Sequence, residues 1–146
     1  MNIVIFGPPG AGKGTQSKFI EKQFNLYQLS TGDLLRDEVK NKTELGLKIS
    51  SIMNSGQLVS DEIVGNLIEK FVSNNKYRDK IIFDGYPRTL IQAKNLDSLL
   101  KKNNQKINIV LKLSVTLDTI KKRISERQIQ EKRSDDSEEI AIKRYE

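Results

Sequence analysis

The feature that most constrains this chain is a glycine-rich segment, residues 7–15, with the sequence Gly-Pro-Pro-Gly-Ala-Gly-Lys-Gly-Thr. It follows four consecutive apolar residues at 3–6 and precedes a stretch with the pattern of a helix. Its spacing is that of a phosphate-binding loop (P-loop), in which glycines let backbone N–H groups approach phosphate oxygens. The helix that starts near Lys13 would add its free N–H groups and the positive end of its dipole. The segment therefore predicts a phosphate site, with Lys13 on the β- and γ-phosphates; the alternative is a plain glycine-rich turn.

Length and composition narrow the class of protein. The chain has 146 residues, enough for one domain with a sizeable core. It contains no cysteine and no histidine, which excludes disulfides, thiol nucleophiles, histidine bases and a Cys/His zinc site. This composition agrees with a reducing cytoplasm. We expect neither a signal peptide nor a membrane span, because the apolar runs are far shorter than the ~20 residues that cross a bilayer.

The charge of the chain favours an anionic ligand. Its 25 basic and 19 acidic residues give a net charge of +6, which suits a polyanionic partner. Nucleic acid is less favoured, because the aromatic residues are few and do not alternate with basic ones. Only seven of the basic residues are arginine, the side chain whose planar fork grips phosphate. They are Arg36, Arg78, Arg88, Arg123, Arg127, Arg133 and Arg144.

Predicted strands alternate with predicted helices. Strands are expected at residues 2–6, 27–29, 80–84 and 107–113, and helices follow each of them, the last from near Asp135 to Glu146. This order predicts an α/β fold with a mostly parallel sheet, whose ligands bind beyond the carboxyl ends of the strands. Asp84 ends an apolar strand there and is a candidate to hold Mg²⁺ through water; helix capping is the alternative. Apolar residues predict inward helix faces at Phe19, Ile20 and Phe24, and at Leu90, Ala93, Leu96, Leu99 and Leu100.

Four segments in a fixed order carry a family resemblance. They are the loop at 7–15, Ser-Thr-Gly-Asp-Leu-Leu-Arg at 30–36, Gly-Gln-Leu-Val at 56–59, and Asp-Gly-Tyr-Pro-Arg-Thr at 84–89 followed by Gln92. The chain resembles adenylate kinase from end to end, and Gly14-Thr15 after the lysine is that family's variant of the loop. The resemblance implies a P-loop NTPase-like sheet flanked by helices in one domain, residues 1–146. Its core would comprise residues 1–29, 60–123 and 137–146, with an AMP-binding helical insertion at 30–59 and a short lid at 124–136.

The same resemblance assigns the two nucleotide sites. ATP would lie on Gly10, Ala11, Gly12, Lys13, Gly14, Thr15, Arg123 and Arg127. Thr31 and Gln92 would help to identify adenine, Arg36 and Arg88 would hold the AMP phosphate, and Pro87 would be cis, fixing the turn that presents Arg88. The AMP site would comprise Thr31, Arg36, Gln57, Leu58, Val59, Gly85, Tyr86, Pro87, Arg88, Gln92, Arg133 and Arg144.

Arginines near the end of the chain are expected to act on the transferred phosphate. Arg123 and Arg127 share one helix face, which alone is typical of a solvated charged helix. By resemblance they contact ATP, while Arg133 and Arg144 reach the phosphates being transferred. The short spacing from Arg127 to Arg133 is that of a short lid without the four-cysteine zinc site. The expected catalytic residues are Lys13, Arg88, Arg123, Arg133 and Arg144.

The expected activity is ATP + AMP ⇌ 2 ADP with Mg²⁺ and without zinc. Phosphoryl transfer depends on positioning and charge neutralisation, so no histidine base is needed. The partners would be ATP, AMP and ADP, with no nucleic acid and no membrane, and the protein would be a cytoplasmic monomer. The alternatives are a UMP/CMP kinase, against which Thr31 and Thr89 argue, and a non-catalytic module that binds nucleotide or nucleic acid.

The last predicted strand raises a question about the end of the chain. Residues 107–113 are apolar on both faces over most of their length, which predicts a strand buried within a sheet. Nothing after them has the pattern of another strand, whereas members of the family usually continue by some tens of residues. The expectation is a fragment with an uncovered edge strand, marginal stability and weak activity.

Overall fold

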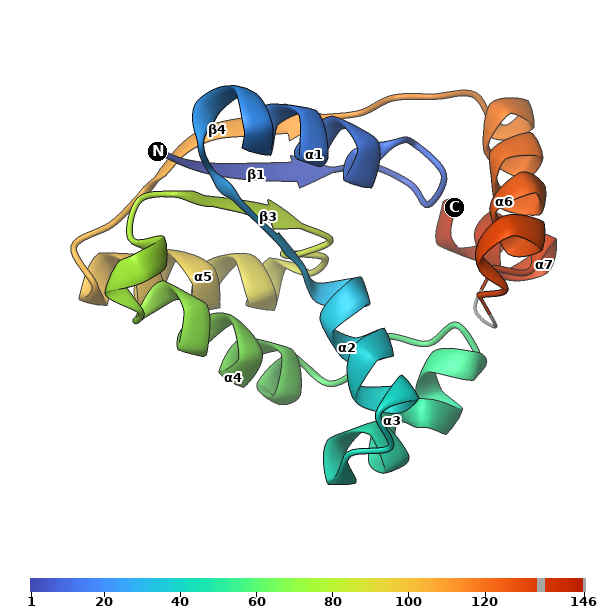
Figure 1. The fold of residues 1–146 in the computed structure, drawn as a ribbon, viewed down its shortest axis with the longest axis horizontal. Helices are drawn as coiled ribbons and strands as arrows, with labels where there is room; N and C mark the ends of the chain where they lie inside the picture. Colours follow the sequence, from blue (N-terminus) through green and yellow to red (C-terminus); the bar gives the residue numbers. More distant parts are fainter. Residues whose placement is uncertain (134–135, 146) are drawn as a thin grey trace.

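The computed structural model describes residues 1–133 and 136–145. Its centre is a parallel sheet of four strands in the order β2-β3-β1-β4 (Figure 1). The strands are β1 (Asn2–Phe6), β2 (Tyr27–Ser30), β3 (Ile81–Asp84) and β4 (Ile107–Lys112). The α/β fold with a parallel sheet flanked by helices is therefore confirmed.

The register of the sheet brings the carboxyl ends of the strands together. Asp84 of β3 pairs with Ile5 of β1 on one side and with Ser30 of β2 on the other. On the far side of β1, Phe6 pairs with Lys112 of β4. The segments that follow these strands therefore leave the sheet at one edge, which is the usual ligand edge of a parallel sheet.

Seven α-helices are described, most of which begin at a side-chain cap. Ser30, Thr43, Ser60, Thr89 and Thr116 each accept a hydrogen bond from a backbone N–H in the first turn of the helix that they start. The ends predicted for the last helix, Asp135 and Glu146, lie outside the described residues. The helices are α1 (Lys13–Phe24), α2 (Thr31–Lys40), α3 (Glu44–Asn54), α4 (Asp61–Val72), α5 (Leu90–Lys102), α6 (Leu117–Glu131) and α7 (Glu138–Tyr145), with a 3-10 turn at Asn75–Tyr77.

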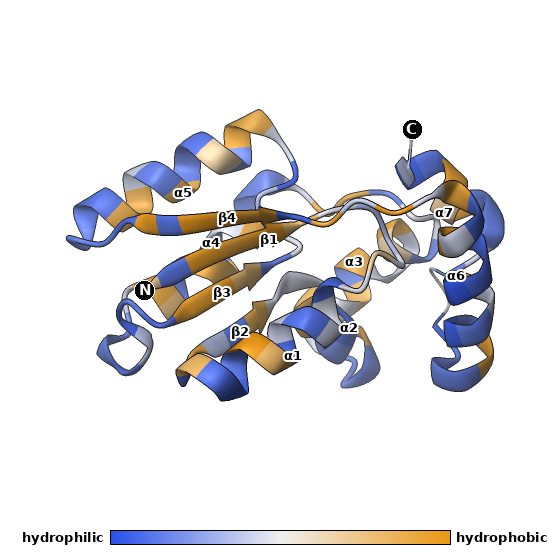
Figure 2. Cartoon of the chain, turned by 90° about the horizontal axis from the view of Figure 1, so that it is seen from above, coloured by the Kyte–Doolittle hydropathy of each residue, from blue (hydrophilic) through white to orange (hydrophobic). Residues whose placement is uncertain are grey.

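Both faces of the sheet are covered, with α4 and α5 on one face and α1 on the other (Figures 1 and 2). Successive strand residues point to opposite faces. Val4 and Phe83 therefore join the larger core beneath α4 and α5. Ile3, Ile5 and Ile82 form a smaller cluster on the face that α1 covers.

Two packing predictions were wrong in part. On α1, Ile20 packs against the sheet, but Phe19 and Phe24 are 67% and 58% exposed, because the short helix turns only one narrow stripe inward. On α5, Leu96 and Leu100 are buried, whereas Leu90 at the first turn is 72% exposed.

Strand β4 lies at the edge of the sheet, in agreement with the expectation of an uncovered edge strand. Its apolar residues Ile109 and Val110 are 40% and 60% exposed. Its only partner strand within residues 1–133 and 136–145 is β1.

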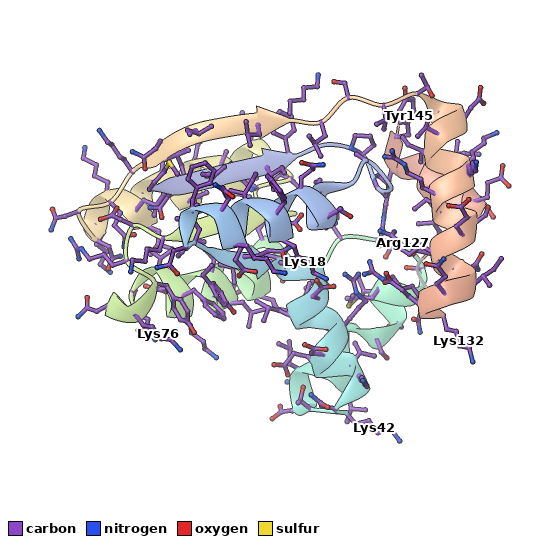
Figure 3. All side chains as sticks on the ribbon, turned by 45° about the horizontal axis from the view of Figure 1, so that its top comes forward. Lys18, Lys42, Lys76, Arg127, Lys132 and Tyr145 are labelled. Carbon is purple, nitrogen blue, oxygen red and sulfur yellow. The ribbon has the colours of Figure 1, made fainter. Side chains whose placement is uncertain are left out.

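Helices α6 and α7 form a unit that stands away from the sheet at the ligand edge (Figure 1). They pack through their own small cluster of Ile120, Ile124 and Ala141. Arg127 and Tyr145 belong to this unit (Figure 3). Among the described helices, none has the length and apolar composition needed to cross a membrane.

Candidate nucleotide-binding site

The loop between β1 and α1 has a backbone that requires glycine. Gly10 and Gly12 have φ angles of 77° and 96°, in the left-handed region that side chains disfavour. At Gly7 a Cβ atom would lie 2.6 Å from the carbonyl oxygen of Leu113, so a larger residue would push the strands apart. The loop thus wraps closely at the start of α1, as predicted for a phosphate-binding loop.

The side chain of Lys13 turns back toward this loop. Its Nζ donates hydrogen bonds to the carbonyl oxygens of Gly7 at 2.8 Å and Pro8 at 3.0 Å. Burial lowers the pKa of Lys13 from its ordinary value of 10.5 to about 8; the Asp84 carboxylate opposes this fall, and the Arg88 guanidinium adds to it. The surrounding protein therefore supplies too little negative charge to balance the ammonium. A bound phosphate would supply that charge.

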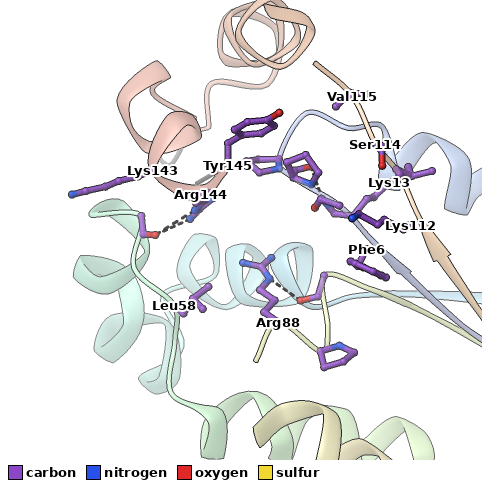
Figure 4. A pocket seen from close by; sticks show the side chains of 17 residues that line it. Phe6, Lys13, Leu58, Arg88, Lys112, Ser114, Val115, Lys143, Arg144 and Tyr145 are labelled. Atoms are coloured by element: carbon purple, nitrogen blue, oxygen red, sulfur yellow. Dashed lines mark hydrogen bonds between the residues drawn. The ribbon is translucent and has the colours of Figure 1, made fainter. Parts of the chain in front are cut away.

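A cavity of about 770 Å³ opens beside this loop (Figure 4). Among the described residues that line it, five are cationic and none is a carboxylate, which makes the cavity suited to a polyanion. They come from four separate parts of the fold: Lys13, Arg88, Lys112, Lys143 and Arg144. The remaining lining residues are Phe6, Gly7, Pro8, Pro9, Gly56, Leu58, Gly85, Pro87, Leu113, Ser114, Val115 and Tyr145.

A second, smaller cavity of about 60 Å³ shares part of this lining. Most of the residues predicted for the AMP site meet there: Thr31, Arg36, Gln57, Leu58, Val59, Gly85, Arg88, Gln92 and Arg144. Gly32, Leu35, Met53 and Val64 complete the wall. The structure thus brings together segments from α2, the loop after α3, the turn after β3 and α7, although their roles toward AMP remain predictions.

The turn after β3 positions Arg88 between the two cavities. The Tyr86–Pro87 peptide bond is cis, as predicted. The Nε atom of Arg88 donates to the carbonyl oxygen of Gly85 at 2.8 Å, and its backbone N–H donates to Oε1 of Gln92 at 2.7 Å. The hydroxyl of Thr31 donates to the same Gly85 carbonyl oxygen at 3.1 Å. This turn is therefore held from α2 as well as from α5.

Asp84 lies at the base of the site and is only 6% exposed. Its Oδ2 atom accepts a hydrogen bond from Nε2 of Gln28 at 2.8 Å. A Cβ atom at Gly14 would lie 3.9 Å from the same oxygen, so this glycine lets the start of α1 approach the carboxylate. Burial raises the pKa of Asp84, while the Gln28 hydrogen bond and the charge of Lys13 work against that rise.

The chemistry of Asp84 fits the predicted Mg²⁺ only as an indirect ligand. Within the described residues there is no group of three or more His, Cys, Asp or Glu side chains that could hold a metal. Mg²⁺ keeps several waters and needs few protein oxygens, so one carboxylate beside a phosphate site satisfies its usual demands.

The structure does not bring all of the predicted arginines into the cavities. Arg144 lines both of them. Its Nη2 and Nε atoms donate hydrogen bonds to the carbonyl oxygen of Gly56 at 3.2 and 3.3 Å. Arg123, Arg127 and Arg133 line neither.

These three arginines bind protein groups instead. Arg123 donates to the carbonyl oxygens of Gly10 and Ala11 in the loop. Arg127 forms two hydrogen bonds of 2.5 Å with Asp136. The Nε atom of Arg133 forms an ion pair with Oε2 of Glu131 at 2.5 Å, and its Nη2 atom lies 3.7 Å from Oδ1 of Asp33. Their assignment to ATP and to the transferred phosphates remains a prediction.

Lys112 and Lys143 are cavity residues that the sequence did not single out. Lys112 ends β4 at the same edge as Gly7 and Asp84, so its position along a predicted strand was the available signal. Lys143 precedes Arg144 on α7 and carried no comparable signal, because only the packing of α7 turns this part of the helix toward the loop.

A glycine-rich loop that leads from the first strand of a parallel sheet into a helix places the chain among the P-loop α/β proteins. The family model described as adenylate kinase matches residues 5–146. The adenylate kinase of Pelagibacter ubique is 56% identical over 132 residues, which cover 90% of this chain and 62% of that protein. Those of Maricaulis maris and Caulobacter sp. are 46% and 44% identical, and the alignments cover 100% and 99% of this chain and 78% and 76% of those proteins. The chain belongs to the adenylate kinase family of nucleoside monophosphate kinases, and it spans less than two thirds of the Pelagibacter relative.

Proposed function

We propose that this protein catalyses the reversible transfer of a phosphoryl group, ATP + AMP ⇌ 2 ADP. The observation that carries the proposal is the cavity of about 770 Å³, which Lys13 and Arg88 both line. Lys13 belongs to the loop predicted for ATP and Arg88 to the site predicted for AMP. Two nucleotides bound at these positions would turn their phosphates toward each other across a space whose described lining includes five cations and no carboxylate. That is the field that phosphoryl transfer requires.

The residues of the cavity would act by position and charge. Lys13 would leave the carbonyl oxygens of Gly7 and Pro8 for the β- and γ-phosphates. Arg88 and Arg144 would hold the accepting phosphate in line for attack. Asp84 would hold Mg²⁺ through water, and the ion would neutralise charge on the transferred group when bound. No residue is required to act as a strong base, in keeping with a chain that lacks histidine.

The α6–α7 unit is proposed to close over the nucleotides. Arg123 would then exchange carbonyl oxygens for phosphate oxygens, which are stronger acceptors, and Arg127 and Arg133 would exchange carboxylates for the phosphates of the bound nucleotides. Such closure would exclude water from the transferred phosphoryl group and prevent ATP hydrolysis. The proposed lid comprises residues 124–136, of which 134 and 135 lie outside the described residues.

Production of ADP from ATP and AMP tests the proposal. We expect ³¹P NMR to show ADP formation that requires both nucleotides and Mg²⁺, with AMP preferred over UMP, CMP and GMP. Preference for a pyrimidine nucleotide would instead make the protein a UMP/CMP kinase. A chain that makes no ADP but binds DNA or RNA with a steep salt dependence would be a binding module. The proposal includes a monomer in the cytoplasm, and light scattering on the purified chain tests the oligomeric state.

A further inference from the structure

The side chain of Gln92 is held at both ends of its amide group. Gln92 lies in the first turn of α5, is 3% exposed and lines the smaller cavity. Its Oε1 atom accepts the backbone N–H of Arg88 at 2.7 Å. Its Nε2 atom donates to Oδ1 of Asp61 at 2.7 Å. Asp61 begins α4, which runs beside α5 (Figure 1), and it does not line the cavity itself.

These two partners allow only one orientation of the amide. A backbone N–H can only donate, and an ionised carboxylate can only accept. If the Gln92 amide turned over, its NH₂ group would face the N–H of Arg88 and its oxygen would face the carboxylate of Asp61. Both contacts would then be repulsive in a buried place, where unpaired polar groups are costly. Because a carboxylate forms a charge-assisted bond, Asp61 is the stronger of the two restraints.

We propose that Asp61 is a positioning residue of the AMP site, which locks the Gln92 amide in one orientation and thereby makes the site select adenine over guanine. The inference rests on the proposed function, since it concerns the nucleotide that this cavity binds. Each end of the amide keeps one further hydrogen-bonding position, an acceptor on Oε1 and a donor on Nε2. Adenine carries an N6 amino donor at the position where guanine carries the O6 acceptor. An amide that can turn over can form hydrogen bonds with either base, whereas an amide held in one orientation can form them with only one of the two.

A matched control separates this role from the general effect of a carboxylate on α4. Asp61 and Glu62 both lie in the first turn of α4, where negative charge interacts favourably with the helix dipole. Glu62 is exposed. Asp61→Ala and Glu62→Ala therefore remove equivalent charges from the same helix end, but only the first removes the acceptor of Gln92. Asp61→Asn keeps the size of the side chain but removes the restraint, because the asparagine amide can turn over and donate to Oε1 of Gln92 as well as accept from Nε2.

The test measures AMP and GMP binding to the 146-residue chain by titration calorimetry. We expect Asp61→Ala to weaken AMP binding about tenfold, as the amide orientation that pairs with adenine falls to about a tenth of the population, with GMP binding unchanged or tighter. Glu62→Ala should keep the AMP/GMP preference of the wild type, whereas Asp61→Asn should reduce it, because only the N–H of Arg88 then restrains the Gln92 amide. An unchanged preference in Asp61→Ala, or an equal loss in Asp61→Ala and Glu62→Ala, would overturn the inference.

A second measurement needs no nucleotide. In ¹⁵N-labelled ligand-free protein, the side-chain NH₂ resonances of Gln92 should shift strongly in Asp61→Ala and little in Glu62→Ala. Failure of the wild type to bind AMP would refute the proposed function, and this measurement would still decide whether Asp61 holds the amide. Gln92 resonances that do not respond to Asp61→Ala would refute the lock itself.

Discussion

Replacing Lys13 by methionine should slow catalysis by orders of magnitude and make the ligand-free protein more stable. Because a tenfold change in proton affinity corresponds to about 1.4 kcal/mol, the fall in the pKa of Lys13 from 10.5 to about 8 corresponds to about 3 kcal/mol of unfavourable interaction. Two contributions reduce that figure. The hydrogen bonds to Gly7 and Pro8 are lost, at about 1 kcal/mol each, and the side chain is partly exposed, so water screens some of the charge. We expect Lys13→Met to be about 1 kcal/mol more stable at pH 7.

The pH dependence of stability tests the origin of this gain. Below pH 8, Lys13 is charged in both the folded and the unfolded protein, so the cost of its burial is fully present. Between pH 8 and 10.5 the unfolded chain binds more protons than the folded one, and wild-type stability should therefore gain from this group as pH rises. Lys13→Met lacks this gain. Its advantage should shrink above pH 8 and reverse near pH 10.5, where only the two lost hydrogen bonds count.

Urea unfolding from pH 7 to 10.5, together with the rate of ADP formation, measures both effects. Lys18→Met is the matched control, because Lys18 is an exposed lysine on the same helix; it should change neither stability nor turnover appreciably. Turnover of Lys13→Met should fall by about 10²–10³, as for removal of one electrostatic contact to a transition state. A Lys13→Met variant that is less stable than the wild type at pH 7 would refute the electrostatic argument. Near-normal turnover would refute the role of the loop.

Three further substitutions test other parts of the site and fold. Arg133→Lys keeps the charge but loses the planar fork, so kcat should fall more than KM changes; a rise in KM alone would make Arg133 a residue of substrate binding. Asp84→Asn should raise the Mg²⁺ concentration for half-maximal turnover about tenfold or more, and an unaltered Mg²⁺ profile would exclude Asp84 from the metal site. Gly46→Ala should cost about 3 kcal/mol or more, because its Cβ atom would lie 2.0 Å from the carbonyl oxygen of Glu38. In urea unfolding, Gly65→Ala should instead be neutral or stabilise by up to about 1 kcal/mol, since a Cβ atom there meets no described atom within 4 Å.

The parts of the fold that could be predicted are those that depend on residues close together in the sequence. The helix starts at Ser30 and Ser60 are of this kind, because a cap involves only a side chain and the backbone three residues later. The parallel sheet followed from the alternation of strands and helices. Burial was less predictable where it depends on distant partners. Ile109 and Val110 lie on a strand with an interior composition, yet they are exposed because β1 is the only described strand beside β4.

In the candidate site, too, the short motifs could be predicted and the contacts between distant residues could not. The loop around Lys13 and the turn around Arg88 are short motifs, so their chemistry could be named from the order of residues alone. The partners of the Gln92 amide could not be named in this way, because Asp61 lies 31 residues away and meets it only where α4 packs beside α5.

By itself the sequence determined the class of fold, the phosphate-binding loop and the cationic character of the ligand site, because each depends on residue type and short spacing. Only the tertiary structure decided which cations share the cavity. It placed Lys112 and Lys143 there and turned Arg123, Arg127 and Arg133 toward carbonyl and carboxylate oxygens. The physical reason is that an arginine or lysine side chain is long and flexible. Its partner is selected by the helices and loops that pack around it, not by its neighbours in the chain.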